Sequence, residues 1–255
     1  LLVLGSNGES AYLDYQEKIE LIRLAAANAA GRLVMAGTGM ETPRDTIALT
    51  NGAARMGADC ALVLPPNYYD GSMTDRALIN FYTAVADAAQ IPILIYNVPK
   101  YTHVVISPYV ISVLSQHPNI IGMKDSTGNM PGFAEFLQAS QGQEFDVIVG
   151  TASALFPALC LGASGGILAL ANCNHKECIE IYRMYQEGEV GKARDLYQSM
   201  LPVNNCVTGR MGIAALKAAC TMQGYHGGCV RQPLLELTED EYGRVRVVLA
   251  NANLI

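Results

Sequence analysis

The sequence predicts an α/β fold built around a parallel β-sheet. Short apolar runs recur at intervals of roughly 25 to 30 residues, and segments with helical periodicity lie between them. Each run is apolar almost throughout, as expected for strands that are buried on both faces. Strands that alternate with helices in this way are typical of repeated strand–helix–strand units, in which all the strands run in one direction.

Each predicted strand is a short apolar run that stops at glycine, proline or polar residues. The strands cover residues 1–5, 33–38, 60–65, 93–97, 120–124, 147–151 and 166–172. The helices between them cover residues 15–30, 43–56, 74–89, 108–115, 130–140 and 153–161. No strand is predicted after about residue 187. Three helices follow, at residues 190–200, 212–223 and 239–252, separated by Pro202, the 224–228 stretch and Pro233.

Seven strands are one fewer than a closed (β/α)8 TIM barrel requires. The chain starts abruptly in an apolar run, at residues 1–4, so we expect the first strand–helix unit to lie upstream. A doubly wound open sheet would carry a glycine-rich dinucleotide loop after its first strand. Residues 5–8 are too short for that loop, and residues 37–39 lack its third glycine. We therefore predict strands 2 to 8 of a barrel in residues 1–187 and a C-terminal helical extension in residues 188–255.

Composition limits the partners of the chain. The formal charge is −6 at pH 7 without a cluster of Lys and Arg, which argues against nucleic acid or an anionic membrane as the main partner. No stretch of about 18 apolar residues is free of polar breaks, so no membrane span is expected. The seven cysteines are odd in number, and Cys60 and Cys160 lie in apolar runs. We expect reduced core thiols and an intracellular location, in the cytoplasm or a mitochondrion, although a targeting segment cannot be judged from this chain.

The polar residues at the predicted strand ends indicate the chemistry. In a barrel the active site forms at the C-terminal ends of the strands. These ends carry one lysine, several tyrosines and hydroxyls, and glycines whose N–H groups can bind a ligand. They carry no pair of histidines and no cluster of carboxylates, which disfavours a metal site. We therefore expect covalent chemistry by an amine, with a tyrosine as proton carrier and with neither a cofactor nor a metal.

The lysine in question is Lys124. It closes the apolar run 119–123 and is followed at once by Asp125 and Ser126. Burial at the end of a strand disfavours the ammonium form and so favours the neutral amine. A neutral lysine amine attacks ketones and forms Schiff bases with them. Taken alone, the segment favours the alternative of a surface lysine that begins a strand-to-loop turn, and the rest of the chain reverses this preference.

Three motifs together resemble those of a known family. They are Gly5-Ser6-Asn7-Gly8-Glu9, Tyr96-Asn97-Val98-Pro99 and Gly122-Met123-Lys124-Asp125-Ser126. In this order they resemble the motifs of the dihydrodipicolinate synthase / N-acetylneuraminate lyase family of class I aldolases. The similarity continues through residues 165–167 and 171–172 into the helical tail. Within the family the chain most resembles the 4-hydroxy-2-oxoglutarate aldolases, in the Gly-Ser-Asn-Gly-Glu form and in residues 115–120. The resemblance also implies a leading strand, helix and loop before residue 1.

The resemblance implies a role for each motif. Lys124 would attack the C2 ketone of a 2-oxo acid, and the resulting iminium would draw electrons from the C3–C4 bond. Tyr96 would carry protons, with Ser6 in the same relay. The N–H groups around Ser6 and Asn7 would hold the carboxylate of the substrate. The alternatives are a packing role for Tyr96 and helix capping by Ser6 or Asn7.

Other site residues are also implied by the resemblance. In the family, one tyrosine of the loop after the third strand of this chain reaches the site of a neighbouring subunit. Spacing to Tyr96 favours Tyr68 over Tyr69, and the expected assembly is a homotetramer made of two tight dimers. Ser126 would bind the distal polar group of the substrate, or simply form a turn. Gly166 and Ile167 would line the site, or allow close packing of a helix against a strand.

Cys173, His175 and Cys178 also invite interpretation as metal ligands. Their spacing matches no common closed zinc pattern, and a fourth ligand is not evident. We expect them instead to cap and begin a helix.

One departure from the family pattern affects the choice of substrate. Five residues after the motif tyrosine, the synthase has an arginine that binds a carboxylate, and this chain has Tyr101. A tyrosine cannot make the paired hydrogen bonds of a guanidinium. We therefore predict an aldolase that cleaves a 2-oxo acid to pyruvate and an aldehyde, best 4-hydroxy-2-oxoglutarate to pyruvate and glyoxylate. The first alternative is a 2-keto-3-deoxy sugar-acid aldolase. Dihydrodipicolinate synthase, neuraminate lyase and a non-catalytic paralogue rank below it.

Overall fold

A computed structural model describes residues 1–255 and shows seven strands in one sheet. The strands follow one another across the sheet in chain order, and each of the first four pairs in parallel with the next. In a doubly wound sheet the strand order reverses near the middle, whereas in a barrel it does not. The strand order therefore confirms the predicted barrel-type α/β fold, with seven strands present.

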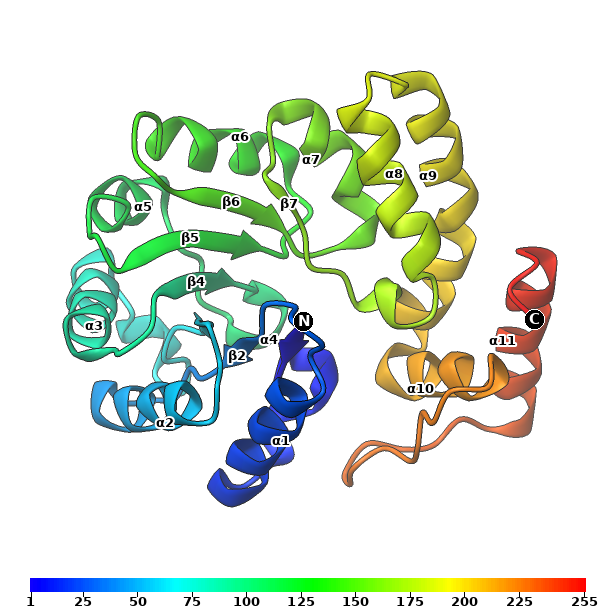
Figure 1. Cartoon of the computed structure of the whole chain (residues 1–255), viewed down its shortest axis with the longest axis horizontal. Helices are drawn as coiled ribbons and strands as arrows, with labels where there is room; N and C mark the ends of the chain where they lie inside the picture. Colours follow the sequence, from blue (N-terminus) through cyan, green and yellow to red (C-terminus); the bar gives the residue numbers. More distant parts are fainter. The chain divides into compact units, whose positions relative to one another are not determined.

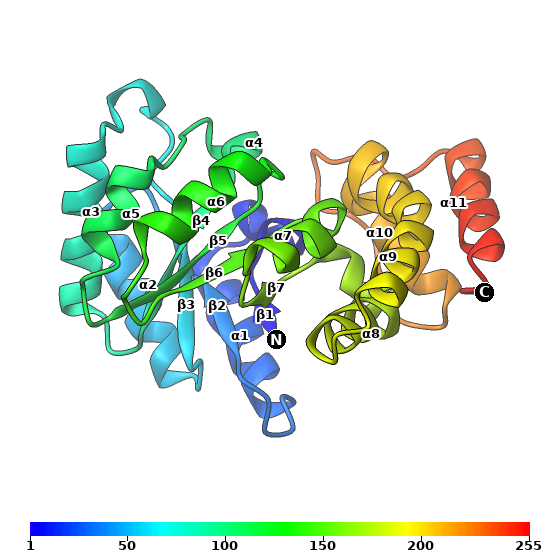
Figure 2. The ribbon, with the colours of Figure 1, turned by 90° about the horizontal axis from the view of Figure 1, so that it is seen from above.

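The strands are β1 (Leu2–Val3), β2 (Met35–Gly37), β3 (Cys60–Val63), β4 (Ile93–Asn97), β5 (Ile120–Asp125), β6 (Asp146–Val149) and β7 (Gly165–Gly166). Helices α1 (Tyr15–Ala27), α2 (Pro43–Arg55), α3 (Asp75–Ala88), α4 (Pro99–Thr102), α5 (Pro108–Leu114) and α6 (Met130–Ala139) lie among the first six strands. The chain forms two compact units, residues 1–148 and residues 149–255. Within the first unit, α2, α3, α5 and α6 lie along the outer side of the curled sheet (Figures 1 and 2).

Side-chain caps fix where the main helices of the first unit begin. Asp14 and Glu17 form a reciprocal capping box at the start of α1. Thr42, Thr74 and Ser107 each accept a backbone N–H three residues later, at the starts of α2, α3 and α5. Proline follows the cap of α2 and of α5, where its missing N–H leaves no hydrogen bond unmade. Each cap marks the end of a polar loop and the start of a helix. These loops follow the C-terminal ends of the strands.

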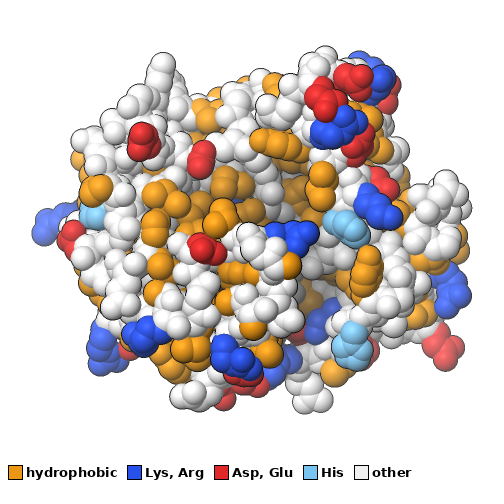
Figure 3. Space-filling view, viewed as in Figure 1, with side chains coloured by type: hydrophobic (Ala, Val, Ile, Leu, Met, Phe, Trp, Pro, Cys, Tyr) orange, Lys and Arg blue, Asp and Glu red, His pale blue; other side chains and the backbone are white.

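The core of the first unit lies between its sheet and its helices. All five residues of β4 are buried, and α3 buries a face that includes Leu78, Phe81 and Tyr82. Tyr82 is fully buried, and its hydroxyl donates to the carbonyl of Val63 at 3.1 Å. Burial of one such large side chain contributes about 1.5–3 kcal/mol. On the face seen in Figure 3, hydrophobic side chains gather over the strands of this unit, and charged groups of both signs are scattered between other polar ones.

The second unit is largely helical. It contains α7 (Leu155–Leu161), α8 (His175–Gln186), α9 (Val190–Asn204), α10 (Gly212–Met222) and α11 (Glu239–Asn251). Helices α8 and α9 lie side by side along their lengths (Figures 1 and 2), and α10 packs on α11. None of the helices combines the length and the apolar composition that crossing a bilayer requires.

Four local predictions were wrong. The strand expected at 166–172 is only Gly165–Gly166, and Ala169–Asn172 is a 3-10 turn. That segment alternates leucine and alanine, which are strong helix formers, and has no β-branched residue after position 167.

Pro202 does not separate two helices but lies inside α9, which continues into a π-helical segment, Asn205–Arg210. The sequence predicted only the start of helix α8, around Cys173, His175 and Cys178, and not its full length. Cys160 is exposed and Cys60 half-buried, so neither is a core thiol.

Candidate active site

The register of β4 on β5 places two pairs of polar residues side by side. Tyr96 lies opposite Lys124, and Asn97 lies opposite Asp125. Successive side chains of a strand point to opposite faces, so the two pairs lie on different sides of the sheet. On one side, the Lys124 Nζ atom is 4.5 Å from the centroid of the Tyr96 ring. The structure thus brings together the two residues that the sequence motifs singled out.

The amine of Lys124 is buried. Lys124 is only 5% exposed, and this burial lowers the pKa of its amine to about 8. The ring of Tyr96 acts in the opposite direction, because the face of an aromatic ring attracts a cation. A pKa of about 8 leaves about a tenth of the amines neutral at pH 7. Lys124 can therefore act as a nucleophile near neutral pH.

The other pair forms a buried hydrogen-bond network that the sequence did not reveal. The Asn97 side-chain amide donates to Asp125 at 2.7 Å, and the Thr127 hydroxyl donates to the other oxygen of the same carboxylate at 2.7 Å. The N–H of Ser126 donates to the backbone carbonyl of Asn97, and the N–H of Ile106 donates to the side-chain oxygen of Asn97. Burial raises the pKa of Asp125, and its hydrogen bonds act in the opposite direction. The network joins the ends of β4 and β5, from which Tyr96 and Lys124 project.

An unusual backbone turn delivers Ser6 to this site. Leu4 directly follows β1 and has a φ of 63°, in the left-handed region that branched side chains rarely adopt. A Cβ atom on Gly37 would lie 2.1 Å from the carbonyl oxygen of Leu4, so only glycine permits this approach. The turn that follows brings the Ser6 hydroxyl to 3.4 Å from the hydroxyl of Tyr96. Lys124, Tyr96 and Ser6 therefore form one contiguous group.

The loop around Ser6 and Asn7 is a short 3-10 turn, Ser6–Gly8, and not the start of α1. Helix α1 is capped by Asp14, so neither Ser6 nor Asn7 caps it, and that alternative is wrong. The first hydrogen bond within the turn runs from the N–H of Gly8 to Gly5. The N–H groups of Ser6 and Asn7 precede this hydrogen bond, and their role in holding the carboxylate of the substrate stays a prediction.

Ser126 follows Asp125 directly after β5. Its hydroxyl oxygen is buried and has no hydrogen-bond partner within the chain. Buried hydroxyls normally have a partner. Ser126 lies two residues after Lys124, and its role in substrate binding stays a prediction. The predicted alternative, a simple turn, does not require the hydroxyl.

Tyr68 and Tyr69 lie in the loop after β3 and are strongly exposed, by 78% and 71%. Their rings meet edge to face with centroids 5.0 Å apart. Neither ring is buried with Tyr96 and Lys124. Their predicted role in the site of a neighbouring subunit remains a prediction.

Gly166 and Ile167 belong to the second unit. A Cβ atom on Gly166 would lie 3.1–3.3 Å from side-chain atoms of Leu155, Leu168 and Val149, which is tight. The N–H of Ile167 donates to Val149 at 2.9 Å. These contacts agree with the alternative of close packing through glycine, and a role in lining the site stays a prediction.

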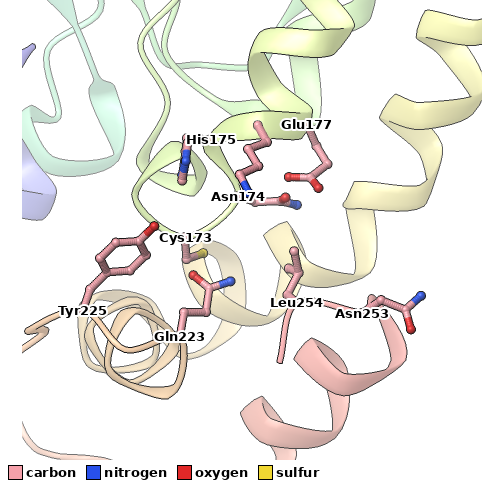
Figure 4. A pocket seen from close by; sticks show the side chains of 9 residues that line it. Cys173, Asn174, His175, Glu177, Gln223, Tyr225, Asn253 and Leu254 are labelled. Carbon is pink, nitrogen blue, oxygen red and sulfur yellow. The ribbon is translucent and has the colours of Figure 1, made fainter.

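Cys173 and His175 line a pocket of about 270 Å³ at the start of α8, with residues that directly follow α10 and residues near the C-terminus (Figure 4). His175 is the first residue of α8, and Asn174 is its N-cap residue. Cys173 and Cys178 are buried, and burial raises the pKa of each thiol to about 12. No group of three or more His, Cys, Asp or Glu side chains is placed to hold a metal ion.

Comparisons with known proteins agree with the fold. A profile described as the Dihydrodipicolinate synthetase family matches residues 1–252. The chain is 35% identical over 251 residues to a protein of Listeria welshimeri named 4-hydroxy-tetrahydrodipicolinate synthase. This match covers 98% of this chain and 85% of that protein.

Solved structures give the same result. The dihydrodipicolinate synthase of Aquifex aeolicus is 34% identical with a TM-score of 0.91, over 99% of this chain and 86% of that one. A prophage protein of the same family from E. coli K12, solved in complex with pyruvate, is 28% identical with a TM-score of 0.92, over 100% of this chain and 87% of that one. The chain belongs to the dihydrodipicolinate synthetase family.

Proposed function

We propose that this chain is a lysine Schiff-base enzyme that acts on 2-oxo acids, with Lys124 as the nucleophile. The observation that carries the proposal is the contiguous group of a buried amine, the Tyr96 phenol and the Ser6 hydroxyl. A buried amine of lowered pKa next to a relay of two hydroxyls supplies the nucleophile and the proton carrier that imine chemistry requires. The pyruvate found in a related structure supports a 2-oxo acid as substrate.

The chemistry follows from this arrangement. The neutral amine of Lys124 adds to the C2 carbonyl, and a proton from Tyr96 lets the C2 oxygen leave as water, which forms the iminium. The iminium accepts the electron pair of the C3–C4 bond, while Tyr96 takes the proton of the C4 hydroxyl and an aldehyde departs. Protonation of the enamine at C3 and addition of water at C2 release pyruvate and the free amine. Ser6 passes protons between Tyr96 and the solvent.

The finer proposal is cleavage of 4-hydroxy-2-oxoglutarate to pyruvate and glyoxylate. It rests on Tyr101, which stands where the synthase carries its carboxylate-binding arginine. Tyr101 lies in α4 just after Tyr96, is 48% exposed, and has the ammonium of Lys100 5.4 Å from the centroid of its ring. A phenol offers one donor in place of the paired N–H groups of a guanidinium.

A second candidate is the condensation of pyruvate with an aldehyde to give dihydrodipicolinate-type products. The names of the relatives favour it more than the sequence does, because two of the three quoted above are called synthases. Both candidates share the enamine of pyruvate on Lys124. They differ in whether a C–C bond is broken or formed and in how the second substrate is held.

One panel of assays separates the candidates. Pyruvate release is measured with 4-hydroxy-2-oxoglutarate and with 2-keto-3-deoxy sugar acids, and condensation is measured with pyruvate and aspartate semialdehyde. We expect the first substrate to be turned over fastest. Robust condensation with little cleavage would establish the second candidate. It would also show that Tyr101 in place of the arginine does not prevent condensation. No turnover in any assay, together with no adduct on Lys124, would leave a non-catalytic paralogue.

We further propose a homotetramer built from two tight dimers. The exposed Tyr68 and Tyr69 rings support it, because two large aromatic side chains exposed in one loop suit burial against another surface. An isologous two-fold contact would exchange these loops in both directions.

A further inference from the structure

A glycine brings the loop after β2 against the end of β3. A Cβ atom on Gly39 would lie 2.3 Å from the backbone N atom of Leu64 and 2.8 Å from its Cβ atom. No larger residue could occupy this position without displacing the backbone. The close approach places the next two residues, Met40 and Glu41, beside the start of the loop that carries Tyr68 and Tyr69.

Buried and capping contacts then hold this segment in place on both sides of Glu41. The Thr46 hydroxyl accepts the N–H of Met40 at 3.1 Å and donates to the carbonyl of Met40 at 3.2 Å, and Thr46 is fully buried. On the other side, the Thr42 hydroxyl accepts the N–H of Asp45 at 3.1 Å and so caps α2. Glu41 therefore projects from a segment that is anchored immediately before and after it.

The carboxylate of Glu41 binds the backbone of the tyrosine loop. Its Oε2 atom accepts the N–H of Asn67 and the N–H of Tyr68, each at 3.0 Å, and its Oε1 atom lies 3.3 Å from the N atom of Asn67. The two residues before Asn67 are prolines, which have no N–H to donate. The carboxylate thus takes the first two donors that the loop offers. Hydrogen bonds of this kind, to a charged acceptor, are stronger than those between neutral groups.

We propose that Glu41 is a positioning residue for the Tyr68–Tyr69 pair. It fixes the backbone directly before the two rings and so sets where they project from the subunit. The proposal rests on the proposed function, whose assembly exchanges these loops between subunits, and it takes one of the two tyrosines to complete the proton relay of the neighbouring site. Glu41 touches neither the substrate nor the phenols and acts only through the loop. The carboxylate of Glu41 binds backbone N–H groups of the loop. In this proposal it does not carry protons in the reaction.

The first experiment tests the anchor without any assay of activity. Hydrogen exchange of the amides of Asn67 and Tyr68 is compared in the wild-type protein, in Glu41→Ala and in Glu135→Gln, a control at an exposed carboxylate on α6. We expect exchange at these two amides to be faster by roughly tenfold or more in Glu41→Ala and unchanged in the control. Unchanged exchange in Glu41→Ala would overturn the proposal.

The second experiment tests whether the anchor matters for the reaction. We expect Glu41→Ala to lower kcat by roughly ten- to a hundredfold, the scale of a misplaced catalytic group, and to leave KM nearly unchanged. Glu41→Gln keeps one side-chain oxygen as acceptor and should recover part of the loss. In a Tyr68→Phe/Tyr69→Phe background, Glu41→Ala should have no further effect on kcat.

Two results of the second experiment would overturn the proposal. One is a wild-type kcat in Glu41→Ala despite faster exchange, and the other is an equal loss of kcat with and without the two tyrosines. Failure of the proposed function is distinguishable from both, because the wild-type protein itself would then turn over none of the substrates. In that case the exchange experiment still decides whether Glu41 holds the loop.

Discussion

At the scale of single residues, the site depends on a lysine held in an unfavourable environment. Burial lowers the pKa of Lys124 to about 8 from an ordinary value of 10.5, so the folded chain holds this proton less tightly than the unfolded chain. Below pH 8 the amine is protonated in both states, and the folded state bears the full desolvation penalty. The stability of the fold therefore rises as pH increases from about 8 to 10.5.

This penalty predicts that removing the amine stabilises the fold. Lys124→Met should be inactive and yet more stable than wild type at pH 7, by up to about 3 kcal/mol, because burial lowers the pKa of the amine from 10.5 to about 8. Urea denaturation at pH 7 and pH 10 measures the difference. The advantage of the variant should shrink at the higher pH, and a variant less stable than wild type at pH 7 would contradict the expected penalty.

The second residue-scale prediction identifies the nucleophile. Incubation with pyruvate followed by borohydride reduction should place a covalent adduct on Lys124, located by mass spectrometry. Adduct formation should accelerate from pH 6 to pH 8 and then level off, because the neutral amine is the reactive form. Lys124→Arg, which keeps the charge, should form no adduct. An adduct on a different lysine would refute the assignment.

The proton carrier is tested in the same way. Tyr96→Phe keeps the ring beside Lys124 and removes the hydroxyl that lies 3.4 Å from Ser6. Turnover should fall by at least about a hundredfold, the usual scale for a lost general acid or base. The comparison is made in steady-state assays with the best substrate of the panel. Turnover close to that of wild type would transfer the role to another group.

At this scale the sequence predicts part of the site well. Lys124, Tyr96 and Ser6 lie in motifs at strand ends, and the strand pairing brings them together. Asn97 and Asp125 were not singled out, although a polar residue at the end of each of two buried strands signals that they need partners. Glu41 carries no such signal, because an exposed glutamate in a loop has the same local pattern whatever it binds.

At the scale of secondary-structure elements, the ends of β4 and β5 are joined by the network of Asn97, Asp125 and Thr127. Asp125→Ala would leave the buried amide of Asn97 and the hydroxyl of Thr127 without their acceptor. We expect a loss of about 1–3 kcal/mol in the free energy of unfolding for each polar group left unpartnered and buried. Asp125→Asn keeps an acceptor oxygen and should lose less. Equal stability of wild type and Asp125→Ala would show that the network does not hold the strands.

The elements also show where local patterns stop being informative. Strands β1 to β6 could be predicted because their apolar runs are short, end at turn residues and alternate with segments of helical periodicity. The last strand could not, since Gly165–Gly166 has no side chains to signal it and the leucine–alanine run after it suits a helix equally well. Pro202 lies inside α9, although a proline in a helix interior removes one backbone hydrogen bond and crowds the preceding turn. The sequence alone therefore predicts a helix end at this position.

At the scale of the whole molecule, the strand order excludes a doubly wound sheet, and the remaining question is assembly. Two adjacent tyrosines are exposed after β3, and the carboxylate of Glu41 fixes the backbone before them. If one of them completes the relay in a neighbouring subunit, a lone subunit lacks part of its active site. Activity should then depend on association, and loss of activity on dilution should parallel dissociation measured by analytical ultracentrifugation.

Mixing two variants with impaired sites tests this shared site most directly. Lys124→Ala removes the nucleophile, and Tyr68→Phe removes the hydroxyl that we expect to be donated across a two-fold contact. In a mixed dimer, one of the two sites has its own Lys124 and receives Tyr68 from the partner, so part of the activity should return. Full activity in a monomer, or no recovery in dimers shown to be mixed, would exclude the shared site. Recovery with Tyr69→Phe but not with Tyr68→Phe would keep the shared site and assign the crossing hydroxyl to Tyr69, since both rings project from the loop that Glu41 holds.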